Sequence, residues 1–282
     1  MSNTFEFDRL KKVIKHDGLS FSQNIGLTLA IFWSLPVVIW LLGIVFSSGD
    51  ARTITVMERV ATINVFLAIL FIIAPVRLYR NCNDSRMGIG YAMLPASTLE
   101  KFLSMAFYCI IVTPIIYLVG ALTIDSILAL ISSSYEDYAI TAYFDDMEQI
   151  EYHIYQSMDG HSEEANFMLG LLSPAKLTFM KIFGILATSS IFMFGNMVFK
   201  KRKTGKMIGI LIILAILFLL LQVKYIDSHE SIIRYNMGNK IAAENYIRQL
   251  VETTLNAILM LEIIVSAVML WGTYHRIKTQ KY

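Results

Sequence analysis

The chain has 282 residues, of which 56% are hydrophobic and only 16% are charged. A soluble globule of this length needs more polar residues to cover its surface, so the composition excludes a soluble domain and indicates an integral membrane protein. The formal net charge of +2 gives no basis for nucleic-acid binding. Cys82 and Cys109 fall in a predicted inner loop and a predicted span, so we expect unpaired, inert thiols.

The N-terminal segment predicts a short basic amphipathic helix. Phe7, Leu10 and Ile14 share one helical face, and Lys and Arg side chains occupy the others. We expect residues 1–24 to form a cytoplasmic helix on the membrane surface, where anionic lipid attracts basic side chains. A solvated N-terminus is the alternative.

Six apolar runs are each close to the ~20 residues needed to cross a bilayer. They lie at about 25–46, 60–76, 102–131, 177–199, 207–223 and 254–274. We therefore predict an all-α integral membrane protein with six transmembrane helices, in which residues 25–282 form one transmembrane domain. An even number of spans places both termini on the same side.

The distribution of Lys and Arg orients these spans. If the N-terminus is inside, the inner segments carry most of the 24 Lys and Arg residues, and none lies between Lys101 and Lys176. The positive-inside rule therefore places both termini and the loop 77–101 in the cytoplasm. The two long outer loops are then 132–173 and 224–252.

The two outer loops differ in character. The segment 132–173 is acidic and aromatic, with no Lys or Arg, so it could receive a cationic substrate or partner, or simply be a solvated hairpin. In 224–252, recurring Ile, Tyr and Leu predict one or two amphipathic helices on the outer membrane surface.

Lys181 on the fourth predicted span and Glu262 on the sixth are charged. Charges are costly in lipid, so they usually pair or line a polar path. Counted from the first residues after the outer loops, 174 and 253, at about 1.5 Å per residue, they lie at similar depths, roughly 10 and 13 Å. We predict an intramembrane polar pair between Lys181 and Glu262, with a charged lining for a substrate path as the alternative.

Catalytic motifs were sought and none was found. The sequence has no HExxH, no GxSxG and no GxxxxGK[ST]. We therefore expect no enzymatic activity, no cofactor and no metal site in this chain, and no ATP binding through a P-loop of its own.

The loop 77–101 ends in Leu94-Pro95-Ala96-Ser97-Thr98-Leu99-Glu100-Lys101. Ser97 and Glu100 have the spacing of a capping box, in which the Ser side chain accepts from a backbone N–H and the Glu reaches back. Pro95 keeps the residue before it out of the helical conformation, so we predict that a helix begins at about Thr98.

This arrangement resembles the permease subunit of ABC-2, or type V, ABC transporters, most closely bacterial members whose permease is a separate polypeptide. The resemblance lies in the N-terminal amphipathic helix, the six spans with both ends inside, and the motif LPxS-x-x-EK at 94–101. It implies a multi-pass protein of the bacterial cytoplasmic (inner) membrane that acts as an exporter. It also implies a separate ATP-binding subunit that holds ATP and magnesium, a second permease copy in a homodimer or heterodimer, and no nucleic acid.

In that family the N-terminal helix is a connecting elbow, and the loop after the second span forms a coupling helix seated in a groove of the ATP-binding subunit. Carried over to this sequence, the coupling element is about 85–94, and the residues behind it hold the third span rigidly. The residues implied are Ser85, Arg86, Met93, Leu94, Pro95, Ser97, Glu100 and Lys101. Gly88 and Gly90 each disfavour a helix here by about 1 kcal/mol. We therefore expect the coupling element to be partly 3₁₀-helical, or to become ordered only when it docks on the ATP-binding subunit.

A function of a different class is also compatible with the sequence. The chain could be a membrane-anchored sensor or interaction protein that reads its signal through the acidic and aromatic segment 132–173. Such a protein would need no ATPase.

Overall fold

The computed structural model describes residues 5–46, 55–83, 88–132, 138–144, 170, 174–236 and 240–279, which contain helices and no strand. The helices are α1 (Phe7–Phe46), α2 (Val56–Leu78), η1 (Arg80–Asn83), α3 (Gly88–Ala92), α4 (Thr98–Ala106), η2 (Phe107–Val112), α5 (Thr113–Ile131), α6 (Ala139–Phe144), α9 (Pro174–Val198), α10 (Lys203–Asn236) and α11 (Lys240–Thr279). Six helical segments are long and apolar enough to cross a membrane. This confirms the predicted multi-pass, all-α class.

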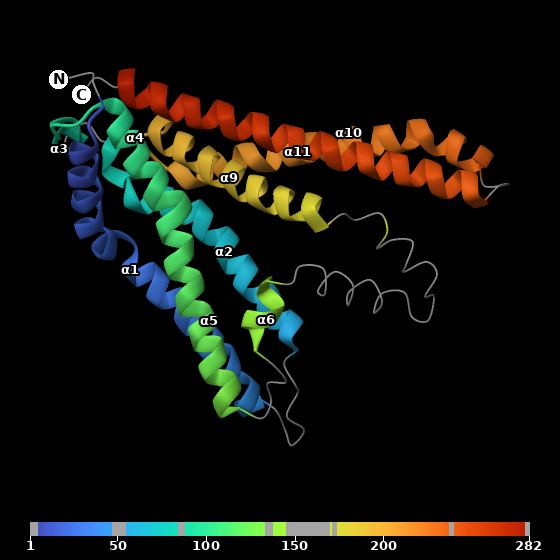
Figure 1. Ribbon diagram of the computed structural model, residues 1–282, viewed down its shortest axis with the longest axis horizontal. Coiled ribbons are helices and arrows are strands. Elements are labelled where there is room, and N and C mark those ends of the chain that lie inside the picture. The colour runs from blue at the N-terminus through green and yellow to red at the C-terminus, as the bar shows by residue number, and fades with distance from the viewer. Residues whose placement is uncertain are drawn as a thin grey trace.

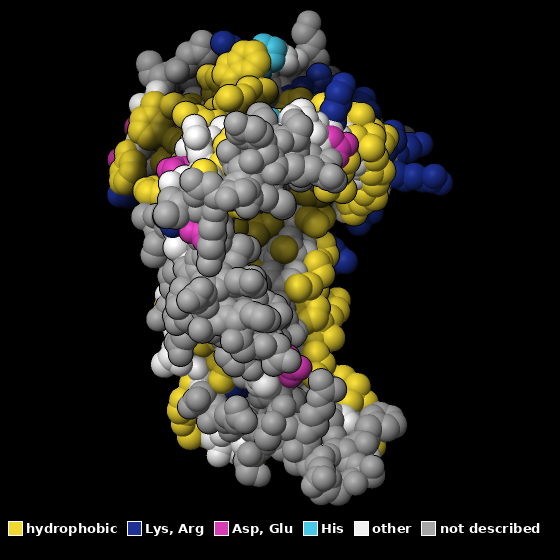
Figure 2. Space-filling model, turned by 90° about the vertical axis from the view of Figure 1, so that its right-hand side faces the viewer, with side chains coloured by type: hydrophobic (Ala, Val, Ile, Leu, Met, Phe, Trp, Pro, Cys, Tyr) yellow, Lys and Arg dark blue, Asp and Glu magenta, His cyan; other side chains and the backbone are white. Residues whose placement is uncertain are grey.

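The long helices form two groups that diverge from one end of the molecule (Figure 1). One group contains α1, α2 and α5, and the other contains α9, α10 and α11. The start of α1, the short helix α3 and the end of α11 lie together where the groups meet, and we call this region the shared end. In Figure 2, apolar side chains line the right-hand side of the molecule, and Lys and Arg gather at the upper right edge.

One continuous helix, α1, replaces the predicted surface helix of residues 1–24 and the first span. It is 40 residues long and changes direction in its first half (Figure 1). No proline occurs before Pro36, so nothing removes a backbone donor at the expected boundary. The structure therefore joins the expected elbow directly to the membrane span.

The face that the first half of α1 buries also differs from the prediction. Leu10, Val13 and Asp17 are buried, whereas Phe7 is exposed. The Lys11 ammonium lies over the Phe7 ring, 4.8 Å from the ring centroid. The buried residues follow the helical spacing i, i+3, i+7, so the stripe is rotated toward Asp17. This rotation brings a carboxylate, rather than an apolar ring, against the neighbouring helices.

The third span runs without a break from α4 through η2 to α5, and it begins at Thr98 as predicted. Its middle section is π-helical. Pro114 has no N–H to donate, which disturbs the regular ladder there. Thr113 compensates, because both its backbone N–H and its hydroxyl donate to the Tyr108 carbonyl, the hydroxyl at 2.7 Å.

The helices α10 and α11 extend beyond the predicted membrane boundaries. Instead of an outer loop with separate surface helices over 224–252, α10 continues to Asn236 and α11 begins at Lys240. Neither Gly nor Pro occurs in 224–236 or in 240–252, so each helix propagates past its apolar section. Residues 237–239 lie outside the described residues.

The main apolar core lies between α1, α2 and α5, with α6 against its far end. A close approach within it requires glycine, because a Cβ at Gly120 would collide with the Trp33 indole. The indole Nε1 donates to the Tyr117 carbonyl at 3.1 Å. Replacing this glycine would therefore separate α1 from α5.

A buried ion pair, which the sequence analysis did not identify, joins α2 to α5 inside this group. The Arg59 Nη1 lies 3.0 and 3.1 Å from the two carboxylate oxygens of Asp125, and the two side chains are only 6% and 5% exposed. Asp125 also accepts from the Ala139 N–H at 3.0 Å, at the first residue of α6. One carboxylate therefore fixes three helices.

We expect Arg59→Met to destabilise the protein by about 3–5 kcal/mol, because it leaves the Asp125 charge buried without its cation. The double variant Arg59→Met/Asp125→Asn should recover at least half of this loss, since the amide oxygen still accepts from Ala139. Unfolding of the purified protein in neutral detergent measures both effects. Simple additivity of the two substitutions would contradict the pairing.

Candidate functional site

The predicted coupling residues lie at the shared end, in and around α3 (Figure 1). Ser85 and Arg86 are outside the described residues. Residues 88–92 form α3 as an α-helix despite its two glycines, and Met93, Leu94 and Pro95 form the turn into α4. The turn is closed by hydrogen bonds from the Met93 N–H to the Ile89 carbonyl at 2.9 Å and from the Ala96 N–H to the Leu94 carbonyl at 2.7 Å.

The predicted capping box at the start of α4 is present. The Ser97 Oγ accepts from the Glu100 N–H at 3.3 Å, and the Glu100 Oε2 accepts from the Ser97 N–H at 2.8 Å. These two bonds satisfy backbone N–H groups that the start of a helix leaves without a backbone acceptor.

Glu100 does more than the predicted cap. Its other oxygen, Oε1, accepts from the Glu6 N–H at 2.8 Å and from the Arg9 Nη2 at 3.2 Å, and the side chain is fully buried. The carboxylate therefore lies at the N-termini of both α1 and α4, where the partial positive charge of a helix stabilises an anion. Glu100 joins the first helix to the third span.

Lys101 holds α3 rather than the body of the span. Its Nζ donates to the Tyr91 carbonyl at 2.9 Å, and the Tyr91 hydroxyl donates back to the Lys101 carbonyl at 3.3 Å. The ammonium also lies 5.6 Å from the Tyr91 ring centroid, within cation–π range. The short helix α3 is thus fixed to the first turn of α4.

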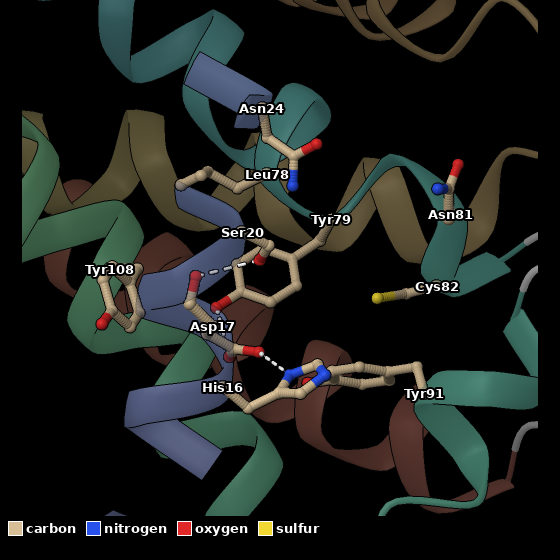
Figure 3. A pocket seen from close by; sticks show the side chains of 10 residues that line it. All are labelled: His16, Asp17, Ser20, Asn24, Leu78, Tyr79, Asn81, Cys82, Tyr91 and Tyr108. Atoms are coloured by element: carbon tan, nitrogen blue, oxygen red, sulfur yellow. Dashed lines mark hydrogen bonds and ion pairs between the residues drawn. The ribbon is translucent and has the colours of Figure 1, made fainter. Parts of the chain in front are cut away.

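A second buried carboxylate, Asp17, lies beside this junction (Figure 3). Its Oδ2 accepts from the Ser104 Oγ at 2.6 Å and from the Tyr79 hydroxyl at 2.9 Å, and its Oδ1 lies 3.3 Å from the His16 Nδ1. Burial, followed by the nearby Asp17 charge, raises the pKa of Tyr79 well above its usual value. The phenol therefore keeps its proton and remains a donor to the carboxylate.

Asp17 was missed by the sequence analysis because nothing in its local sequence separates it from the other polar residues of an amphipathic helix. Its role depends on Tyr79 and Ser104, which follow it by 62 and 87 positions. The contacts tie α1 to the end of α2 and to α4, so they reinforce the connection that Glu100 makes.

A pocket of about 180 Å³ opens next to Asp17. Its walls come from α1, the end of α2, η1, α3 and η2 (Figure 3), and the lining residues are His16, Asp17, Ser20, Asn24, Leu78, Tyr79, Asn81, Cys82, Tyr91 and Tyr108. Burial and the charge of Asp17 raise the pKa of the Cys82 thiol to about 12. The thiol is therefore neutral, and the pocket offers hydrogen-bonding groups rather than a nucleophile.

Three large apolar side chains are exposed on the outer surface of this junction. Ile89 on α3 is 43% exposed, Met93 in the turn is 74% exposed, and Leu99 in the first turn of α4 is 40% exposed. We call them the apolar patch. Ile89 and Met93 lie outside the candidate membrane spans, whereas Leu99 is the second residue of the span Thr98–Ile131.

The predicted ion pair between Lys181 and Glu262 is not formed, although α9 and α11 pack side by side. The Lys181 Nζ lies 5.1 Å from the ring centroid of Tyr143 on α6. The Glu262 carboxylate lies against Gly184, where an added Cβ would be 3.2 Å from its Oε1. Lys181 therefore contacts the Tyr143 ring, and Glu262 occupies the space beside Gly184, so the two charged groups have different neighbours.

The structure leaves other predicted features untested. Most of the acidic and aromatic segment 132–173 lies outside the described residues, which include from it Ser132, α6 with Tyr138 before it, and Gly170. On α9, Thr188 donates to the Gly184 carbonyl, and Asn196 donates to the Pro75 and Tyr79 carbonyls at the end of α2. Cys82 and Cys109 are buried, and neither forms a disulfide.

We expect Glu100→Gln to destabilise the protein by about 2–3 kcal/mol, because a neutral amide offers one acceptor where the carboxylate serves both Glu6 and Ser97. Hydrogen exchange of the backbone amides in 6–20 should become faster. Unfolding in detergent and exchange mass spectrometry measure the two effects.

The matched control is Glu58→Gln, in the exposed capping box that Thr55 and Glu58 form at the start of α2. Gln serves a capping box nearly as well as Glu, so this loss should stay below about 1 kcal/mol. Equal losses for the two variants would show that Glu100 acts only as a cap.

The fold and this junction were compared with known proteins. No protein-family model, no curated protein and no solved structure matched the chain significantly.

Proposed function

We propose that this chain is the membrane-spanning permease subunit of an ATP-driven ABC exporter and that it docks a separate ATP-binding subunit through α3 and the start of α4. The proposal rests on the resemblance carried by residues 94–101. The observation that supports it most is the apolar patch of Ile89, Met93 and Leu99. Burying a side chain of this size against a partner contributes about 1.5–3 kcal/mol.

The framework behind the patch is suited to passing on a movement. Lys101 and Tyr91 fix α3 to α4, and Glu100 fixes α4 to the start of α1. The third span continues from α4 to Ile131. A displacement of the patch by a closing pair of ATPase subunits would thus reach α1 and the far side of the membrane through packed helices.

The remaining parts of the proposal follow from the same resemblance. ATP and magnesium are held by the partner subunit, and the membrane is the bacterial cytoplasmic (inner) membrane. The positive-inside rule predicts that the shared end faces the cytoplasm. A second permease copy completes the transport path, since six spans are half of the usual complement. The long helix α10 leaves apolar side chains exposed along its length, for instance Ile213, Leu217 and Leu221, which lipid or that second copy would cover.

We expect Met93→Asp to reduce the recovery of a P-loop ATPase that co-purifies with the full-length chain by at least ~10-fold, since an aspartate must be desolvated at the interface. Pull-down under mild extraction, followed by mass spectrometry, measures the recovery. Glu100 is unsuitable for this test because it is buried and structural.

The control is Phe144→Asp, on α6 and therefore away from the shared end (Figure 1), where the side chain is 77% exposed. It should retain the ATPase at the wild-type level. The docking surface is refuted if Met93→Asp and Phe144→Asp retain equal amounts, and the transporter proposal fails if the wild type retains none.

A further inference from the structure

A second cleft, of about 350 Å³, opens at the shared end between the end of α2 and the turn from α9 to α10. Its lining residues are Val76, Arg80, Asn81, Lys200, Lys201, Arg202 and Lys203. Five of these seven side chains carry a positive charge, and none carries a negative one. We call this feature the basic cleft.

Four of the five cationic side chains of the basic cleft are open to solvent. Arg80, Lys200, Lys201 and Arg202 are exposed, and no ion pair among the described residues includes any of the four. Like charges gathered around one cleft repel one another and raise the local concentration of anions. An anion bound between them would relieve this repulsion.

The floor of the basic cleft is built from buried hydrogen bonds. The Lys203 Nζ donates to the Arg80 carbonyl at 2.7 Å and to the Asn196 Oδ1 at 2.8 Å. Asn196 in turn donates to the Pro75 and Tyr79 carbonyls at 3.0 and 2.9 Å. The carbonyl oxygens at the end of α2, which would otherwise repel an anion, are therefore already bonded to donors.

The backbone of the turn adds to the positive character of the cleft. Arg202 has φ 50°, in the left-handed region that favours Gly or Asn over a long side chain. The helix α10 begins at the next residue, so the positive pole of its dipole lies at the cleft wall. A strained arginine is thus held beside a helix start that attracts anions.

The position of the cleft relative to the spans indicates the source of the anion. Candidate membrane spans end at Leu78 and Val198 and begin at Lys203, so the cleft lies level with the boundary of the apolar layer. Phospholipid headgroups lie at this level, and basic pockets between span ends bind anionic ones.

We propose that the basic cleft binds a phosphate group, carried by an anionic phospholipid or free in solution. Its volume falls within the range of about 300–1,000 Å³ that is usual for small-ligand sites. The inference depends only on the contacts above and stands whether or not the chain is a transporter.

The test uses the full-length protein in neutral detergent and measures the Tm while one of three additives is titrated: phosphatidylglycerol, phosphatidylcholine or inorganic phosphate. For the wild type we expect the Tm to rise with phosphatidylglycerol and not with phosphatidylcholine. The variant Lys200→Gln/Lys201→Gln/Arg202→Asn should weaken the apparent affinity at least ~10-fold, since it removes three of the five cations that line the cleft. Asn is chosen because it tolerates the left-handed backbone.

The matched control is Arg77→Gln/Lys206→Gln/Lys278→Gln, which removes the same charge from exposed side chains that do not line the cleft. It should change the affinity less than about twofold. Arg80→Gln, on the opposite wall, provides a second variant that leaves the turn intact and should also weaken binding.

A rise in Tm with inorganic phosphate alone, lost in the cleft variants, would assign the site to free phosphate, whereas a response only to phosphatidylglycerol would assign it to lipid. Equal losses in the cleft and control variants would overturn the proposal, as would equal responses of the wild type to all three additives.

Discussion

The buried carboxylate of Glu100 is the constraint on which the shared end depends. It is fully buried, and it accepts hydrogen bonds from two backbone N–H groups that begin different helices, as well as from Arg9. An anion in that position is stable only while both helix starts face it. The start of α1 and the start of α4 are therefore fixed relative to each other. Because Lys101 fixes α3 to α4, α3 is held in the same arrangement.

A second carboxylate, Asp17, extends the same constraint to the end of α2. Its partner Tyr79 directly follows α2 and its partner Ser104 lies on α4. The first half of α1 is therefore held at Asp17 as well as at its start. This explains why α1 is not an independent helix on the membrane surface. It also gives the apolar patch of Ile89, Met93 and Leu99 a rigid base, which any partner that pushes on it would need.

Charged groups in this protein fall into two classes that differ in how they are neutralised. Within the fold, Arg59 and Asp125 form a buried pair, Glu100 pairs with Arg9 and accepts from two backbone N–H groups, and Asp17 accepts from two hydroxyl groups. Around the basic cleft, Lys200, Lys201 and Arg202 remain open to solvent. Buried charges stabilise an arrangement only when every partner is present, whereas the exposed group is free to take a ligand from outside the chain.

The sequence alone was sufficient for the features that depend on neighbouring residues. Hydropathy predicted six spans, and the Ser97 and Glu100 spacing predicted the start of α4, because span length and helix capping are local properties. The tertiary structure decided how each helix is rotated about its axis. That rotation buries Asp17, pairs Arg59 with Asp125 and directs Lys181 and Glu262 to different neighbours. The rotation is set by packing between residues that lie far apart in the chain. The periodicity of a single helix does not contain that information, so it could not predict these contacts.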